Sequence, residues 1–253
     1  MKKVILQGRN ICKVFSRRKA KNNVLNNIDV DIFEKDFTII MGASGAGKST
    51  LMYALSGMDS VTGGSVVYRG KDICRLSEKE MADIRARKFG FVFQQSHLVS
   101  NLTLLENVLV AGYVGRTGKG SGIRKRAELL LGEMGILDAA NRLPAETSGG
   151  EAQRAAIARA VINAPDIIFC DEPSGALNKS NTEEVLNLLS ERNRKGQSIL
   201  MVTHDLRAAA RGNRILYLED GKILDELELP VYQPKEDRGR ERRLQDWLSG
   251  LQW

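Results

Sequence analysis

Apolar and polar residues alternate along the first part of the chain in the manner of β-strands. Residues 4–15 and 24–33 each show this alternation, and the polar segment 16–23 separates them. Such a pattern predicts two half-buried strands that pair in an antiparallel sheet around a turn. Thr38 to Met41 are instead consecutive apolar or β-branched residues, which predict a buried strand. The chain is therefore expected to begin with β-structure.

The hydrophobic period changes to that of helices in the middle of the chain. From Thr103 to Ile162, apolar residues recur at the spacing of one helix face. The glycine-rich segment 112–122 interrupts this pattern, and we expect it to be an exposed spacer loop. These features predict a helical lobe at about residues 97–163, inserted into a protein that is otherwise built on a sheet.

Strands and helices then alternate towards the carboxyl end. Residues 167–172 and 198–204 are apolar runs of strand length, and residues 180–195 between them have a helical pattern. This order predicts right-handed parallel crossovers, and sheets of this kind bind ligands at the carboxyl ends of their strands. The polar side chains that follow such ends are Gln94, Asp171, Glu172 and His204. We expect them to belong to a ligand site.

A glycine-rich loop follows the buried strand and leads into a helical pattern. Its glycines allow consecutive backbone N–H groups to turn inward, and the helix that starts at Lys48 adds its positive end. Lys48 can reach the β- and γ-phosphates of a nucleotide, and the Ser49 hydroxyl can hold Mg²⁺. With a strand before it and a helix after it, this loop fits the P-loop pattern better than a turn with a chance Lys-Ser pair. The predicted phosphate cradle comprises Gly42, Ala43, Ser44, Gly45, Ala46, Gly47, Lys48, Ser49 and Thr50.

Composition narrows the classes of function. The chain has 253 residues, of which 42% are hydrophobic, and no apolar run approaches the roughly 18 residues that span a bilayer. Its start lacks a signal-peptide pattern, so a cytoplasmic location is expected. The formal net charge is +7, but the basic residues are spread in small groups, which favours a solvated basic face, followed by attraction to anionic lipid headgroups. Nucleic acid is not an expected partner.

A set of sequence elements, all in the same order, resembles the ATP-binding subunit of ABC transporters between about residues 4 and 227. The elements are the cradle at 42–49, Gln94, the signature segment 148–151, the Asp171-Glu172 pair, the turn 174–177 and the segment 203–205. The resemblance implies an α/β fold, with a P-loop NTPase core of the RecA type and a mainly parallel sheet. It also implies an N-terminal antiparallel β-subdomain and an inserted α-helical subdomain. The expected ATPase domain is residues 1–229, followed at 230–253 by a basic linker and an amphipathic helix.

The resemblance also implies how ATP is bound and hydrolysed. Lys48 and the cradle N–H groups neutralise charge on the transferring phosphoryl group, and Glu172 polarises the attacking water. His204 contacts the γ-phosphate. The ring of Phe15 stacks on adenine, although its pattern alone is explained equally well by a core residue. The residues that match the Mg²⁺ site are Ser49, Gln94 and Asp171.

The signature segment makes a second anion-binding helix start, because it precedes a long helix. Its residues are Ser148, Gly149, Gly150 and Glu151. Since the chain has one cradle only, the resemblance implies that two copies face each other head to tail, each signature covering the ATP of the other copy. It further implies an integral membrane permease as partner, reached through the segment 94–106, and a peripheral position on the cytoplasmic face of the membrane.

Finer features indicate a branch of the family and leave two alternatives. The motifs at 42–49, 91–94, 102–108 and 174–177 look like the branch that serves lipoprotein release, macrolide or toxin efflux and antimicrobial-peptide resistance. Export or extraction of lipophilic or peptide substrates, or force transmission across the membrane, is expected on this basis. Asn178 stands where the family has aspartate, which leaves open a regulatory subunit with low turnover. The other alternative is a soluble ABC ATPase without a transport role, although residues 95–147 leave no room for the coiled coil of such proteins.

The tail after residue 229 has its own pattern. Leu244, Trp247, Leu248 and Leu251 fall on one face of a predicted helix. Such a helix can pack on its own domain or on the twin subunit, or it can dock on the membrane or a membrane protein. On the second alternative, we expect deletion of residues 234–253 to leave basal ATPase activity intact and to weaken assembly with the membrane subunit.

Overall fold

The computed structural model describes residues 2–17, 20–115, 122–234 and 237–251. The chain forms two compact units. The first comprises Met1–Met81 and Arg192–Trp253, and the second comprises Ala82–Glu191. Helices α2 (Glu78–Lys88) and α6 (Lys179–Arg194) contain the points at which the chain passes from one unit to the other.

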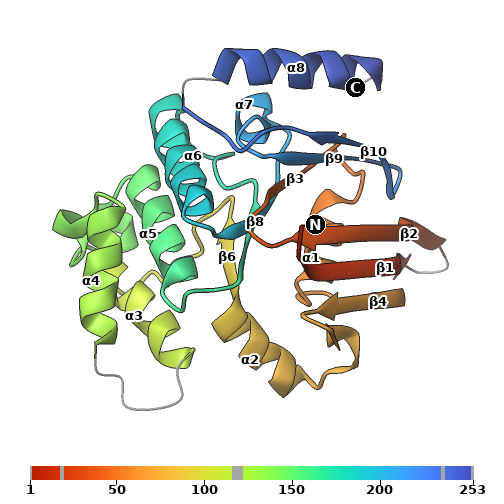
Figure 1. Cartoon of the computed structure of the whole chain (residues 1–253). Coiled ribbons are helices and arrows are strands. Elements are labelled where there is room, and N and C mark those ends of the chain that lie inside the picture. The colour runs from red at the N-terminus through yellow and green to blue at the C-terminus, as the bar shows by residue number, and fades with distance from the viewer. Residues whose placement is uncertain (1, 18–19, 116–121, 235–236, 252–253) are drawn as a thin grey trace. The chain divides into compact units, whose positions relative to one another are not determined.

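The first unit contains an antiparallel sheet with the strand order β2-β1-β4-β5 (Figure 1). Its strands are β1 (Val4–Arg17), β2 (Ala20–Phe33), β4 (Gly63–Tyr68) and β5 (Lys71–Asp72). The predicted strands are confirmed, but the predicted turn at 16–23 is too long, because β1 and β2 remain paired as far as Arg17 and Ala20. Pairing uses backbone groups, so it continues through a polar segment that lacks the hydrophobic signal of a strand.

A second set of strands in this unit carries the phosphate cradle. Strand β3 (Phe37–Met41) lies between β8 (Ser198–Val202) and β9 (Arg214–Glu219) and is parallel to both. Every residue of β3 is buried, as its apolar run predicts. Strand β10 (Lys222–Glu228) pairs with β9 in the antiparallel direction. Because β3 and β8 run in parallel, the segments that follow them, the cradle and His204, start from the same edge of this sheet.

Short helices follow these two strands. Helix α1 (Lys48–Leu55) begins directly after the cradle, and α7 (Leu206–Ala209) begins directly after His204 and Asp205. The Asp205 carboxylate accepts hydrogen bonds from the backbone N–H groups of Arg207 and Ala208, at 2.7 and 3.3 Å, and so starts α7. The turn between β8 and α7 is therefore fixed by local hydrogen bonds.

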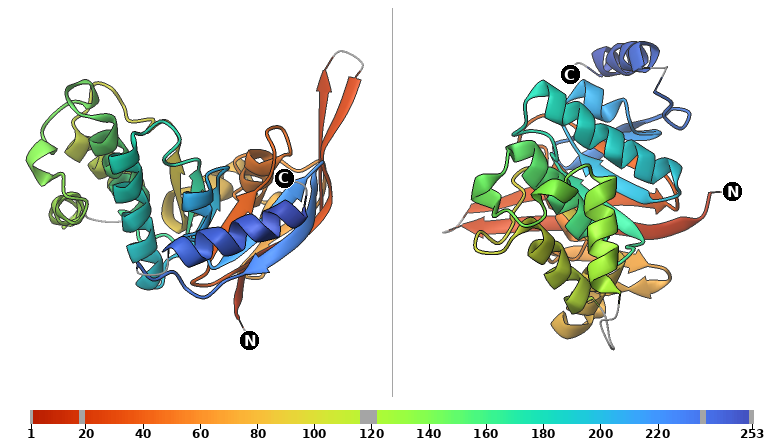
Figure 2. Two further views of the ribbon diagram at one scale, coloured as in Figure 1. Left: turned by 90° about the horizontal axis from the view of Figure 1, so that it is seen from above. Right: turned by 90° about the vertical axis from the view of Figure 1, so that its left-hand side faces the viewer.

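The second unit combines two parallel strands with three packed helices (Figures 1 and 2). Its elements are β6 (Phe89–Phe93), α3 (Leu104–Val114), α4 (Ile123–Glu133), α5 (Gly149–Val161) and β7 (Ile167–Asp171), with 3₁₀ turns at Leu137–Ala139 and Pro144–Glu146. A further 3₁₀ turn at Ile73–Arg75 belongs to the first unit. The helical character predicted between Thr103 and Ile162 is thus present.

The glycine-rich segment begins later than predicted. Helix α3 continues to Val114, so Gly112 lies inside the helix and is buried. A Cβ on Gly112 would come within 2.7 Å of the Ile123 side chain on α4. Glycine at this position therefore permits close helix packing, and composition alone misassigned it to a loop. Residues 116–121 of the predicted spacer lie outside the described residues.

The tail forms helix α8 (Asp237–Gly250), which packs on the first unit beside α7. Leu244 and Leu248 are buried, and the Trp247 ring meets the Tyr217 ring of β9 edge to face, with centroids 6.3 Å apart. In Figure 1, α8 lies above α7. Of the alternatives that the sequence left open, packing of the apolar face on its own domain is the one that the structure shows.

Candidate functional site

The cradle has the backbone conformation that its glycines predict. Gly42, Gly45 and Gly47 have φ angles of 150, 83 and 102°, in the region where a side chain causes strain. The Lys48 ammonium is buried and donates to the carbonyl oxygens of Gly42 and Ala43 at 2.9 and 2.8 Å. A positive charge and the start of α1 therefore face the inside of this loop, which suits a phosphate.

Neighbouring strands leave no room for side chains on two of these glycines. A Cβ on Gly42 would lie 2.0 Å from the Leu218 carbonyl oxygen on β9, and one on Gly47 would lie 2.8 Å from the Val24 carbonyl oxygen on β2. The turn after β9 also holds the loop, because the Gly221 N–H donates to the Ala46 carbonyl oxygen at 3.2 Å. The first unit thus supports the cradle from both of its sheets.

The first unit also carries His204 and Phe15. The His204 side chain is exposed at the turn between β8 and α7. The Phe15 side chain on β1 is 46% exposed, which excludes the core role that its sequence pattern left open. The Lys13 ammonium lies 5.0 Å from the centroid of its ring and is held by the Asp59 carboxylate at 2.7 Å. An exposed aromatic ring can stack on a nucleobase.

The second unit brings Gln94 and Glu172 together. Phe93 and Asp171 are register partners in the parallel pair β6 and β7, so Gln94 and Glu172 follow paired positions. The Gln94 Nε2 and Glu172 Oε2 atoms lie 3.0 and 3.3 Å from the point that a Cβ on Gly175 would occupy. The Gln94 amide and the Glu172 carboxylate therefore meet at one strand edge, directly after Asp171 in the chain.

Glu172 has an unusual backbone conformation. Its φ angle is 46°, a left-handed value that is uncommon for a residue with a side chain. The Glu172 carbonyl oxygen accepts a hydrogen bond from the Gly175 N–H at 3.0 Å. Strained residues of this kind persist where surrounding contacts fix them, and they cluster at functional sites. This geometry motivates a chemical role for Glu172.

The signature segment starts α5 with a reciprocal cap. The Ser148 hydroxyl accepts from the Glu151 N–H at 3.2 Å, and the Glu151 carboxylate accepts from the Ser148 N–H and hydroxyl, both at 2.8 Å. The backbone N–H of Ser148, and then its hydroxyl, lower the pKa of Glu151. Glu151 was predicted among the nucleotide contacts, and the structure shows its carboxylate bound to the start of its own helix.

Asn178, where the sequence resemblance implies an aspartate, caps a helix. Its side-chain oxygen accepts a hydrogen bond from the Asn181 N–H at 2.9 Å, which caps the start of α6. The Asn181 side chain in turn lies against Gly150, where a Cβ would come within 2.3 Å of its oxygen. The substitution removes a charge but leaves this local structure in place.

The residues predicted to hold Mg²⁺ have suitable chemistry. Ser49 in the first unit offers a hydroxyl oxygen, and Gln94 and Asp171 in the second unit offer an amide and a carboxylate oxygen. Within the described part of the chain, no three His, Cys, Asp or Glu side chains gather as a metal cage. A few oxygen donors are what Mg²⁺ uses when phosphates and water complete its shell. These residues therefore fit the ion.

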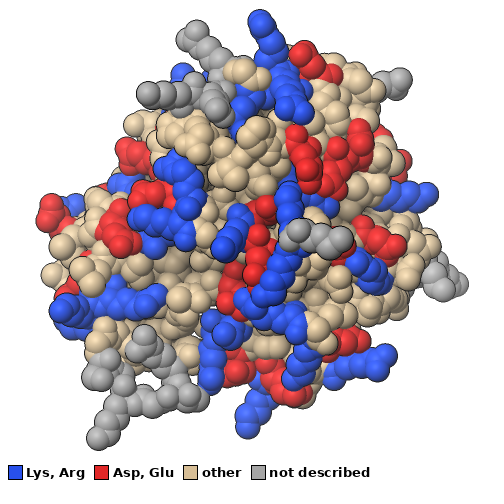
Figure 3. Space-filling model, viewed as in Figure 1, with Lys and Arg blue, Asp and Glu red and all other residues tan. Residues whose placement is uncertain are grey.

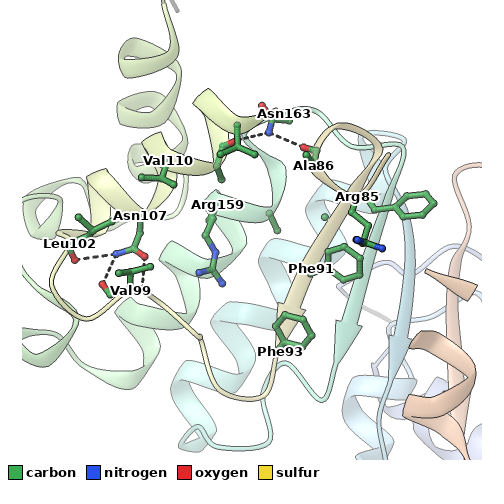
Figure 4. Close-up of a pocket in the computed structure, with 15 residues that line it drawn as sticks. Arg85, Ala86, Phe91, Phe93, Val99, Leu102, Asn107, Val110, Arg159 and Asn163 are labelled. Atoms are coloured by element: carbon green, nitrogen blue, oxygen red, sulfur yellow. Dashed lines mark hydrogen bonds between the residues drawn. The ribbon is translucent and has the colours of Figure 1, made fainter. Parts of the chain in front are cut away.

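The second unit also contains an apolar groove of about 370 Å³ that the sequence did not reveal. Figure 4 shows the Phe91 and Phe93 side chains of β6 facing it, together with Val99 and Val110. The Asn107 amide donates to the carbonyl oxygens of Val99, Leu102 and Thr103, at 3.1, 3.0 and 3.0 Å. One buried side chain thus shapes the loop that forms this groove.

Two side chains of α5 hold the segment that carries Gln94. The Arg159 guanidinium donates to the carbonyl oxygens of Ser96 and His97, at 2.7 and 2.6 Å, and the Gln153 amide donates to that of Phe93. Sequence reasoning assigned no role to either residue. The signal available was a long polar side chain on a helix in which alanine is the commonest residue.

Comparison with known proteins identifies the family of this chain. A family model described as ABC transporter matches residues 25–175. A dimeric structure of the ATP-binding cassette MJ0796 in a post-hydrolysis state, bound to ADP and Pi, is 37% identical to this chain. The match covers 90% of this chain and 100% of that cassette, with a TM-score of 0.84.

A second dimeric structure of MJ0796, described as a bacterial ABC transporter cassette, is 38% identical over the same shares, also with a TM-score of 0.84. CbiO1 from Clostridium perfringens, part of the cbiONQ ABC transporter complex, is 24% identical, covers 96% of this chain and 94% of its own, and has a TM-score of 0.80. At that identity it shows likeness of fold alone. The two MJ0796 structures confirm the predicted fold class. Since the family model matches more than half of the chain and the MJ0796 cassette matches it over most of its length, the chain belongs to the ABC transporter family and is an ATPase.

Proposed function

We propose that two copies of this chain close head to tail around ATP and use its hydrolysis to drive an integral membrane partner. The observation that carries the proposal is that the chain has two helix starts suited to phosphate. One is the P-loop cradle at the start of α1, and the other is the signature segment at the start of α5, which has no P-loop of its own. The cradle follows β3, and Ser148 caps helix α5, where Ser148 and Gly149 are exposed and Gly150 is buried. A second copy gives the signature segment a nucleotide to bind. The dimeric MJ0796 structures support this arrangement.

In this proposal each site residue has a chemical role. Lys48 and the cradle N–H groups stabilise charge on the γ-phosphate, and His204 contacts the same group. Glu172 polarises the attacking water, and Phe15 stacks on the adenine ring. Ser49, Gln94 and Asp171 would hold Mg²⁺, which would neutralise charge on the phosphates.

The membrane partner is proposed to dock at the apolar groove. Val99, Val110 and Val114 line this groove and are 49, 47 and 67% exposed. Exposed apolar surface around a groove is typical of a protein interface. The groove includes part of the segment 94–106, so a partner seated there can respond to movements of Gln94. Within the described residues, no helix is long and apolar enough to cross a bilayer.

We place the chain on the cytoplasmic face of the cell membrane, bound through its partner. By its motifs it belongs to the branch that exports or extracts lipophilic or peptide substrates, or transmits force across the membrane. On the face shown in Figure 3, basic side chains are interspersed with acidic ones. This mixture supports a solvated surface and gives no basic stripe for nucleic acid on that face.

The alternative of a regulatory subunit with low turnover rests on Asn178. The hydrogen bond from the Asn181 N–H to Asn178 shows that the cap of α6 is retained without the aspartate charge. Lys48, Glu172 and His204 are all present, and Glu172 and Gln94 converge within their unit. An active ATPase is therefore the better-supported proposal.

Phosphate release from the purified chain tests the proposal. The rate per molecule should rise with protein concentration, because hydrolysis needs the dimer. Glu172→Gln should lower turnover by at least about 100-fold while ATP binding is retained, and ATP should convert this variant into a stable dimer on size exclusion. A rate per molecule that is independent of concentration contradicts the dimer. Equal, negligible rates in both proteins favour the regulatory alternative.

Docking at the groove is tested with the cognate membrane protein in detergent. Val110→Asp should abolish co-purification while the soluble ATPase rate stays unchanged. The matched control is Leu129→Asp, which changes a residue that is 60% exposed on α4 and does not line the groove. Equal retention of the partner by both variants contradicts the proposed docking site.

A further inference from the structure

A single buried amide connects the signature helix to the two strand ends of the second unit. Gln153 on α5 is 2% exposed. Its Nε2 atom donates to the Phe93 carbonyl oxygen at 2.7 Å and to the Pro173 carbonyl oxygen at 2.7 Å. A primary amide has two N–H donors, so this side chain uses both of them here. Phe93 directly precedes Gln94, and Pro173 directly follows Glu172.

The two hydrogen bonds from Gln153 hold backbone carbonyl groups next to Gln94 and Glu172. The position of this backbone determines where the Gln94 and Glu172 side chains point. Glu172 holds its left-handed φ of 46° between β7 and Pro173. Such a conformation persists only where the surroundings fix it. The Gly175 N–H fixes the Glu172 carbonyl oxygen, and the Gln153 amide fixes the next carbonyl group, that of Pro173. The second N–H of the same amide fixes the residue before Gln94.

Gln153 also lies within the first turns of the signature helix. Helix α5 starts at Gly149, next to its cap Ser148, so Gln153 follows this start by little more than one turn. A helix moves as a rigid element, so a shift of its capped end displaces Gln153 by a similar distance. The described contacts therefore link the signature residues, through one side chain, to Glu172 and Gln94 of the same copy.

We propose that Gln153 is a positioning residue for ATP hydrolysis, which couples the start of the signature helix to Glu172 and Gln94. When Ser148, Gly149 and Gly150 engage the ATP of the second copy, Gln153 passes the shift of α5 to the two strand ends. Each copy then adjusts its own carboxylate and glutamine in response to its partner's nucleotide. This inference rests on the proposed function, because it assigns the signature segment to the second copy's ATP.

The alternative is that Gln153 only stabilises the fold. Asn193 offers a matched control, because its buried amide also donates to two carbonyl oxygens, those of Lys35 and Gln197, both at 2.9 Å. None of these three residues belongs to the site. Replacing either amide by an apolar side chain of similar size leaves two carbonyl groups without that donor, so the two variants should lose similar stability.

The experiment compares Gln153→Met and Asn193→Leu with the wild-type chain. Thermal unfolding checks that both variants fold, and phosphate release gives kcat and the ATP concentration at half-maximal rate. We expect Gln153→Met to lower kcat by about 10- to 100-fold, since small misplacements of catalytic groups cost that much. The half-saturating ATP concentration should change by less than about twofold, as expected when the transition state alone is affected. Asn193→Leu should keep the wild-type kcat.

A second measurement separates positioning from dimer formation. Gln153→Met is combined with Glu172→Gln, and ATP-dependent dimerisation is followed by size exclusion. The dimer should form at the same ATP concentration as with Glu172→Gln alone. Loss of the dimer overturns the inference, because Gln153 would then act on the contact between signature and ATP. A wild-type kcat in Gln153→Met, or the same loss in Asn193→Leu, overturns it as well.

If Gln153→Met does not fold, Gln153→Asn tests the same inference. Gln153→Asn keeps both donors on a side chain that is one carbon shorter, so it cannot hold both carbonyl groups at hydrogen-bond distance. Its kcat should also fall, and a wild-type kcat overturns the inference. A wild-type chain that neither hydrolyses ATP nor dimerises with it disproves the proposed function itself, before any variant is compared, and the inference falls with it.

Discussion

The phosphate cradle of the first unit and the strand ends at Gln94 and Glu172 in the second unit differ in how far along the chain their contacts reach. In the cradle, the Lys48 ammonium bonds to carbonyl groups five and six residues earlier in the sequence. At Glu172 and Gln94, the Gln153 amide bonds to carbonyl groups 60 residues earlier and 20 residues later. The first element is built mostly from its own residues, and the second is assembled from three distant segments.

This difference indicates which change should disturb each element. The cradle depends on glycines whose conformations few other residues adopt, so a single methyl group can damage it. The strand ends at Gln94 and Glu172 depend on hydrogen bonds from helix α5, so movement of that helix can adjust them. A chain that combines a fixed binding element with an adjustable chemical element suits a machine in which binding and hydrolysis are separate steps.

The largest effect is expected when the conformation of the cradle is broken. Gly42→Ala places a methyl group at a φ of 150°, 2.0 Å from the Leu218 carbonyl oxygen, so the loop or β9 must shift. ATP binding should weaken by at least about 100-fold, as measured with a fluorescent ATP analogue, because phosphate contacts need accurate placement.

Gly45→Ala is the control for this prediction. Gly45 has a φ of 83°, but a Cβ there would meet nothing within 4 Å. The variant has backbone strain of about 1 to 2 kcal/mol and no clash, so ATP binding should fall by about 30-fold or less. Equal losses in both variants would show that backbone preference, and not the contact with β9, limits the cradle.

A smaller effect, on stability alone, is expected when Arg240 on α8 is replaced. The Arg240 guanidinium on α8 is buried and donates to the carbonyl oxygens of Ala210, Gly212 and Pro230, at 2.8, 2.6 and 2.7 Å. Arg240→Ala should lower the free energy of unfolding by about 2 to 4 kcal/mol, measured in urea, because buried carbonyl groups lose their donor. The turnover of the folded fraction should not change.

Arg243→Ala is the matched control, because Arg243 is exposed on the same helix and makes a longer bond, of 3.4 Å, to the Glu228 carbonyl oxygen. Its effect should stay below about 0.5 kcal/mol. If Arg240→Ala is equally mild, α8 contributes little to the first unit. In that case deletion of residues 234–253 should also leave the stability unchanged.

The smallest effect is expected in how the free energy of unfolding depends on pH at Glu151. Hydrogen bonds from Ser148 lower the pKa of Glu151 below its ordinary value of 4.5 in the folded chain. Stability from this contact is present above the unfolded pKa and is lost as the pH falls through the lowered, folded pKa. Between about pH 7 and pH 3, Glu151→Gln should therefore show a weaker fall in unfolding free energy than the wild type. Identical pH profiles contradict this assignment.

Much of the site could be predicted because its motifs are local. The cradle, the capped start of α5 and the strand ends at Gln94, Asp171, Glu172 and His204 are each visible within a few residues of sequence. The predicted turn at 16–23 failed because strand pairing does not require apolar residues. The loop prediction for Gly112 failed because the side chains that pack on it, Ile123 at the start of α4 and Ile162 just after α5, come from other parts of the chain.

The sequence by itself determined the phosphate cradle, the α/β alternation and the membership of the ABC transporter family, since these follow from short patterns of residue type. Only the tertiary structure decided which alternatives hold for Phe15 and α8, because exposure and docking depend on what packs nearby. It alone decided that Gln153 joins two strand ends. The physical reason is that a hydrogen bond between distant segments depends on where folding places a carbonyl group, and residue type does not encode that position.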